Sequence, residues 1–179
     1  MNSLITSLQH HASRFPDEKV SCDATTTWIQ KYREFAFVKE NFDWHLTGSM
    51  MITNPEKTKV LLMFHKKFQR WQQFGGHCDG ETDVRSVALR EFHEESGISR
   101  DPHIVEDIFM VDVHDISMDA KWRKAHQHFD IIYLGTIPED TPFSRQESEV
   151  DDIRWFDIST IERYVEDDMV ERIRKILIF

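Results

Sequence analysis

The sequence predicts an α/β fold in which mixed strands lie between helices, and three observations point to it. Segments with the two-residue period of a strand alternate with segments of helical period along most of the chain. Turn-forming residues such as Asn54, Pro55, Gly75 and Gly76 separate these segments. No internal repeat or low-complexity linker divides the 179 residues, which are close to the length of one domain.

Residues 1–45 are expected to form a helical extension. Apolar residues at helical spacing make two stripes. The first stripe, which ends at Pro16, comprises Leu4, Ile5, Leu8, Ala12 and Phe15, and the second comprises Trp28, Ile29, Tyr32, Phe35 and Ala36. Asp23 is a suitable N-cap for the second helix. We expect the extension to pack against the body or against another subunit, which would make a homodimer, and a purely structural role is the simpler interpretation.

Residues 46–179 are expected to form the α/β body. Strands are predicted at residues 49–53, 59–65, 70–74, 108–116, 129–137 and 153–156, with a turn at 54–57. The fourth of these strands has a clear signature, because Phe109, Val111 and Val113 alternate with more polar neighbours. Helices are predicted at residues 159–164 and 168–178.

Residues 76–98 contain the segment that says most about function. Val84, Val87, Ala88 and Phe92 recur at helical spacing and give this segment a buried stripe. Thr82 is expected to cap the helix with Asp83 in its first turn, and Gly97 is expected to end it in a left-handed conformation.

Three glutamates of this helix are the candidate metal ligands. Glu91, Glu94 and Glu95 are three or four residues apart or adjacent, so their carboxylates project from one face. Without a cation, each like-charged pair at helical spacing costs roughly 0.2–0.5 kcal/mol. Oxygen ligands favour a hard cation, Mg²⁺ or Mn²⁺. A solvated acidic face is the alternative interpretation of such a helix.

The segment resembles the sequence motif of the Nudix hydrolases, which are MutT-like enzymes. That motif is Gly, five residues, Glu, seven residues, then Arg-Glu-apolar-x-Glu-Glu-x-Gly-apolar, and Gly76 and the run from Arg90 to Ile98 fall in register. Thr82 stands where the family has its first glutamate, which puts the usual contact of that glutamate in doubt. The resemblance implies an α/β/α sandwich with a mixed central sheet, a Mg²⁺ or Mn²⁺ cofactor, and metal binding at Gly76 and the three glutamates. It also implies that Arg90 orients a catalytic glutamate.

Several residues outside the motif are further candidates. Glu149, with Glu147 next, stands on a loop where many Nudix enzymes carry an additional acidic ligand or a general base, although an ordinary acidic turn is the alternative. The candidates for substrate contact are His77, Arg123, Lys124, His126 and His128. Alternation places the last two histidines on one side of a strand. Satisfied polar histidines and a solvated basic loop, which includes Lys121, are the alternatives.

The amino-acid composition limits the classes of molecule that the protein is expected to bind. The formal net charge of −10 argues against nucleic acid and anionic membranes as partners. The small phosphorylated substrate that the resemblance implies would need local neutralisation by a metal ion and a few basic side chains. Cys22 and Cys78 make no disulfide framework and no signal-peptide pattern is present, so a cytoplasmic location is expected. Cys78 as a nucleophile is a weaker alternative to Cys78 as a buried thiol.

The function expected from these residues and the resemblance is metal-dependent hydrolysis of a diphosphate linkage. Water would attack phosphorus in a nucleoside diphosphate derivative or a nucleoside triphosphate. Trp71, Trp122 and Phe129 are candidates for stacking on a base, and core packing is their alternative. Two other functions stay open: a nucleotide-binding sensor without turnover, and an isomerase acting on an isoprenoid diphosphate, for which Cys78 in a turn is a poor match.

Overall fold

The computed structural model describes residues 1–40, 44–116 and 126–179. The helices are α1 (Asn2–Arg14), α2 (Lys19–Tyr32), α3 (Val84–Ser96) and α4 (Asp167–Arg174), with short 3-10 turns η1 (Pro16–Glu18), η2 (Arg33–Phe37), η3 (Ile158–Arg163) and η4 (Lys175–Leu177). The strands are β1 (Trp44–Thr53), β2 (Lys59–His65), β3 (Arg70–Gln72), β4 (Phe74–His77), β5 (His103–Ile104), β6 (Met110–Ile116), β7 (His126–Thr136) and β8 (Val150–Asp157).

All the strands join one mixed sheet with β1 at its centre. The sheet has the order β3-β2-β1-β7-β5, and β4 also pairs with β1, β6 with β7, and β8 with β2. The β1–β7 pair is parallel, from Trp44 opposite Gln127 to Thr53 opposite Thr136, whereas β2 and β4 run antiparallel to β1. Because one strand holds both kinds of neighbour, segments from both halves of the chain meet along it.

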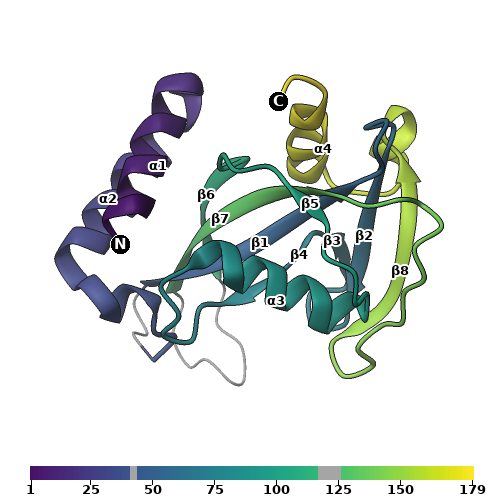
Figure 1. Ribbon diagram of the computed structural model, residues 1–179, viewed down its shortest axis with the longest axis horizontal. Helices are drawn as coiled ribbons and strands as arrows, with labels where there is room; N and C mark the ends of the chain where they lie inside the picture. Colours follow the sequence, from purple (N-terminus) through teal and green to yellow (C-terminus); the bar gives the residue numbers. More distant parts are fainter. Residues whose placement is uncertain (41–43, 117–125) are drawn as a thin grey trace.

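The two faces of the sheet are buried under different helices. Leu46, Met50 and Ile52 of β1 pack in one core with the apolar stripe of α3. Met51 points to the other face and packs in a second core with α4. Figure 1 shows α3 along the lower side of the sheet, α4 on the upper side, and α1 with α2 together at the left. The fold is therefore the expected mixed sheet between helices.

The N-terminal helices contact the body through apolar and aromatic side chains. Leu8 of α1 and Ile29 of α2 are buried in the same core as the stripe of α3. Trp28 stacks on Trp44 and on Phe129, with ring centroids 5.1 and 5.6 Å apart. Among the described helices, none is long and apolar enough to cross a membrane.

Several predicted boundaries were wrong, for local reasons. Asp23 does not cap the second helix, because the turn at Pro16–Glu18 restarts the helix at once and α2 begins at Lys19. The strand predicted at 49–53 begins at Trp44 instead, because polar residues in its first half interrupt the apolar alternation that predicts a strand. The strand predicted at 70–74 is two strands that pair with different neighbours. The helix predicted at 159–164 is the 3-10 turn η3, and α4 ends at Arg174.

Candidate active site

Helix α3 is held close to the central strand. Its N-cap is Asp83, whose side chain accepts hydrogen bonds from the backbone N–H and the hydroxyl of Ser86, so the predicted cap at Thr82 was wrong. Gly97 ends the helix with φ +64°, as predicted. A Cβ at Gly48 of β1 would lie 2.7 Å from the carbonyl oxygen of Val84. The absence of that carbon lets the helix approach the sheet.

Arg90 links the acidic face of α3 to strand β4. Its guanidinium lies 2.7 Å from a carboxylate oxygen of Glu91 and 3.6 Å from one of Glu94. It also donates a 3.1 Å hydrogen bond to the carbonyl oxygen of His77. Three acceptors on two elements use the forked geometry of the guanidinium, which a lysine ammonium cannot reproduce. Arg90 therefore fixes the Glu91 carboxylate relative to the strand.

The Glu95 carboxylate is buried against the glycines of β4. The residue is 2% exposed and accepts a 2.8 Å hydrogen bond from the backbone N–H of Gly75. Burial raises the pKa of Glu95 to about 9; the Gly75 hydrogen bond opposes this rise, and the charges of Glu91 and Glu149 add to it. The Glu95 carboxylate is thus held in a region with little water, near other acids.

Glu91 lies directly over Gly76. A Cβ at Gly76 would lie 2.5 Å from the Glu91 carboxyl carbon and 2.7 Å from each of its oxygens. The Glu91 side chain is 13% exposed, and burial raises its pKa, while Arg90 acts in the opposite direction. The glycine therefore provides the space in which this carboxylate rests.

The loop that carries Glu149 is bonded to the last turn of α3. The backbone N–H of Ser144 donates to the Ser96 carbonyl at 2.9 Å, and that of Gln146 donates to the Glu95 carbonyl at 3.1 Å. The charge of Glu149 contributes to the raised pKa of both Glu91 and Glu95, so this exposed side chain lies within electrostatic range of theirs. The structure thus brings Glu149 to the glutamates of the helix.

This donor set fits a hard divalent cation. Carboxylate oxygens are the ligands that Mg²⁺ and Mn²⁺ prefer, and a cation would offset the mutual repulsion that raises the pKa of Glu95. The carboxylates are held separately, Glu91 by Arg90 and Glu95 by Gly75, and Glu94 is 50% exposed. Among the described residues, one group of three or more His, Cys, Asp or Glu side chains has all its ligand atoms within 4.8 Å of one another. It consists of the histidines His45, His77 and His128.

Those histidines lie on the sheet face opposite α3. His126 and His128 of β7 have Nε2 atoms 3.3 Å apart, which agrees with the predicted alternation, and the His77 ring lies 5.3 Å from that of His128. Burial first, and then four neighbouring imidazoles, lower the pKa of His128, so its ring is neutral. Sequence reasoning missed His45 of β1, which is 1% exposed and 4.6 Å from the His128 ring.

Other candidates fall away from the site or outside the described residues. Lys121, Trp122, Arg123 and Lys124 lie in the range 117–125, which the structure does not describe. Phe129 is fully buried, and Trp71 packs edge-on against Phe64 and Phe156, which favours their interpretation as packing residues. Cys78 is 1% exposed and burial raises the pKa of its thiol, which favours a packed thiol over a nucleophile.

Comparisons with known proteins identify the family. The family model described as the NUDIX domain matches residues 44–178. None of the curated proteins matches this chain. Solved structures show the same fold at low identity.

A C. elegans Ap4A hydrolase in a binary complex is 19% identical, with 75% of this chain and 96% of that chain covered and a TM-score of 0.54. The MutT protein from Methanosarcina mazei Go1 is 16% identical, with 75% and 93% covered and a TM-score of 0.56. The NUDIX domain of Shewanella oneidensis NrtR, complexed with ADP ribose, is 20% identical, with 74% and 87% covered and a TM-score of 0.53. The family model matches most of the chain, and the motif at Gly76–Ile98 lies within the matched residues. The chain therefore belongs to the Nudix family.

Proposed function

We propose that this protein is a metal-dependent hydrolase that cleaves a diphosphate linkage by attack of water on phosphorus. Its substrate is a nucleoside diphosphate derivative or a nucleoside triphosphate. The observation that carries the proposal is the seating of Glu91 against Gly76 and of Glu95 against Gly75, with Glu149 within electrostatic range of both. An ordinary solvated acidic helix face would leave such carboxylates in water.

The side chains of the site have distinct roles in this proposal. Glu91, Glu94 and Glu95 would hold Mg²⁺ or Mn²⁺ beside the backbone of Gly76, and the ion supplies charge neutralisation and a more acidic water when bound. Arg90 positions Glu91 through its 2.7 Å contact. Glu149, on a loop bonded to the end of α3, takes the proton of the attacking water.

The substrate class rests on charge and on the neighbours. A chain with net charge −10 does not attract a polyanion over its whole surface, so binding depends on the local cation and a few side chains. Structural neighbours include a protein named as an Ap4A hydrolase and a domain bound to ADP ribose, both of which involve small nucleotide phosphates. The proposed substrate contacts are Arg123 and Lys124. His77, His126 and His128 are proposed contacts as long as they hold no cation.

A phosphate-release assay with Mg²⁺ or Mn²⁺ and a coupled phosphatase tests the proposal. The panel comprises nucleoside triphosphates, nucleotide sugars, dinucleotides and CDP-alcohols. We expect metal-dependent release from at least one compound, and a loss of roughly 100-fold or more in Glu94→Gln and Glu95→Gln, because a neutral amide cannot replace a carboxylate at a cation. Full metal-dependent activity in both variants would overturn the metal-site assignment.

The Glu149→Gln variant tests whether Glu149 is the general base or a metal ligand. We expect turnover to fall with Mg²⁺ affinity little changed, as measured by titrating activity and by calorimetry. If the variant instead loses metal affinity, Glu149 is a ligand, and the base lies on α3.

A sensor that binds nucleotide without turnover is the second candidate. It is favoured by Thr82 in place of the first glutamate of the motif, and by the NrtR domain with bound ADP ribose as a structural neighbour. Tight nucleotide binding in calorimetry, together with silence across the whole panel, would favour it over the hydrolase.

A further inference from the structure

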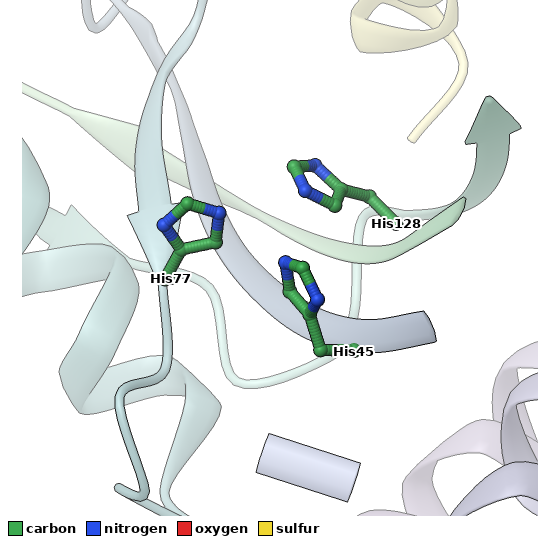
Figure 2. A group of neighbouring side chains, drawn as sticks. All are labelled: His45, His77 and His128. Atoms are coloured by element: carbon green, nitrogen blue, oxygen red, sulfur yellow. The ribbon is translucent and has the colours of Figure 1, made fainter. Parts of the chain in front are cut away.

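Three imidazoles from three adjacent strands converge on one space. His45 of β1, His77 of β4 and His128 of β7 each offer a ring nitrogen, and these atoms all lie within 4.8 Å of one another. Figure 2 shows the rings turned toward a common point between the strands. Their ring centroids are 4.6 to 5.3 Å apart.

The strand register produces this convergence. His45 is paired directly with His128 across the parallel strands, and His77 is paired with Thr47. Thr47 is two residues from His45, so all three histidines point to the same face of the sheet. On β6, His114 is paired with His128 and extends the row of imidazoles. The cluster is thus fixed by backbone pairing along β1, the central strand.

The neighbouring row on the same face carries carboxylates. Asp112 and Asp130 are paired with each other, and Asp130 with Thr47, one step along the strands from the histidines. Asp112 accepts a 2.7 Å hydrogen bond from Nδ1 of His114. Asp130 is buried and accepts hydrogen bonds from the hydroxyls of Thr47 and Ser49 at 2.9 and 2.8 Å. Arg172 pairs with Asp112 at 2.6 Å, so of the two carboxylates Asp130 is the one whose negative charge favours a cation beside the imidazoles.

We propose that His45, His77 and His128 form a binding site for a borderline divalent transition-metal cation, of which Zn²⁺ is the representative. Imidazole nitrogens suit zinc, copper, nickel and cobalt, whereas Mg²⁺ and Mn²⁺ take oxygen. A tetrahedral zinc with bonds of about 2.0–2.1 Å separates its ligand nitrogens by roughly 3.3 Å, so the rings need only small rotations to bind. His126, whose Nε2 is 3.3 Å from that of His128, lies next to this group of three.

This site is separate from the carboxylates of α3. Adjacent residues of β4 point to opposite faces, Gly76 toward Glu91 and His77 toward the histidines. The donor atoms also differ, nitrogen on one face and oxygen on the other. His77 and His128 are only half-buried, which leaves a path for the cation from solvent.

Zinc titration of chelator-treated full-length protein, monitored by competition with a chromophoric chelator, tests the proposal. We expect one equivalent to bind with high affinity, and the affinity to fall by roughly 100-fold or more in His77→Gln and in His128→Gln. His103→Gln, which removes an exposed histidine from β5, is the matched control and should leave the affinity unchanged. The double variant Glu94→Gln with Glu95→Gln should keep the zinc site whether or not the hydrolase proposal holds.

Cobalt provides a second measurement that needs no variant. Co²⁺ bound by three or four nitrogens in a tetrahedral site absorbs visible light far more strongly than octahedral Co²⁺ in water. We expect this absorption in the unmutated protein, its removal by one equivalent of Zn²⁺, and its persistence in excess Mg²⁺. Absence of the band, or zinc binding that is equally weak in His77→Gln, His103→Gln and the unmutated protein, would show that the histidines only pack on one another.

Discussion

The Glu95 carboxylate, at the end of α3, accepts a 2.8 Å hydrogen bond from the backbone N–H of Gly75 in β4. This bond joins the last turn of the helix to the first half of the strand. It also opposes the burial that raises the pKa of Glu95. The acid is therefore held in place by the fold itself.

Gly76→Ala should damage activity far more than stability. The new Cβ would meet only the end of the flexible Glu91 side chain, at 2.5 Å from its carboxyl carbon, so the carboxylate is displaced while the backbone stays. We expect turnover to fall by roughly 10-fold or more in the phosphate-release assay, with the melting temperature nearly unchanged. Gly80→Ala is the control: no atom lies within 4 Å, although its φ of +92° makes the variant strained. Equal activity of both variants would contradict a role for the Gly76 space.

Arg90→Lys should lower turnover by about 10-fold, because one ammonium cannot contact Glu91, Glu94 and the His77 carbonyl together. If Arg90 acts by positioning Glu91, the same substitution should cost little more in a Glu91→Gln background. A double-mutant cycle on kcat measures this coupling. Additive losses would mean that Arg90 acts on the substrate directly.

Neither thiol should react in the native protein. Cys22 and Cys78 are both 1% exposed, and burial raises the pKa of each, that of Cys22 to about 11. We expect a colorimetric thiol reagent at pH 8 to modify neither until urea unfolds the chain, and Cys78→Ala to retain turnover. Rapid native modification of Cys78, with loss of activity, would restore it as a candidate nucleophile.

Stability should fall in mild acid because of His11. Burial, with help from the charge of Lys175, lowers the pKa of His11 to about 4, although the Glu18 carboxylate 2.8 Å from its Nε2 acts in the opposite direction. The unfolded chain takes up its proton near the ordinary pKa, so stability is full above pH 6.5 and is lost as pH falls toward 4.

Urea unfolding at pH 7 and pH 5 measures this effect. The free energy of unfolding should drop by about 2 kcal/mol between the two values, less any contribution of opposite sign. His11→Gln should flatten the difference, and the exposed His10→Gln should not. An unchanged pH dependence in His11→Gln would refute the assignment.

Local signals explain what could be predicted from the sequence. The strand at residues 59–65 has the bounds of β2, and the helix ends at Gly97 with a positive φ as expected. The motif at Gly76–Ile98 likewise lies within one short segment, so its register could be read without tertiary information. Turn residues, apolar period and the glycine at a helix end act over a few positions.

Pairing between distant segments explains which features could not be predicted from the sequence. His45 appears in the sequence as a lone histidine, and it becomes a neighbour of His128 only because β1 and β7 run parallel in one register. Asp130 likewise accepts hydrogen bonds from Thr47 and Ser49. These two residues lie on β1, where buried polar side chains interrupt the apolar pattern. No periodicity in a single segment reveals which partner strand will lie beside it.

The alternation of β4 makes the strand sensitive to length. Gly76 and His77 face opposite sides of the sheet, and each is matched to side chains that come from other elements. Inserting or deleting one residue in β4 would make its side chains point to the opposite faces of the sheet. The His77 imidazole would then lie against Glu91, and Gly76, which has no side chain, would take its place among the histidines. A substitution in β4 therefore affects the side chains on one face of the sheet, whereas a change of one residue in its length disturbs both faces.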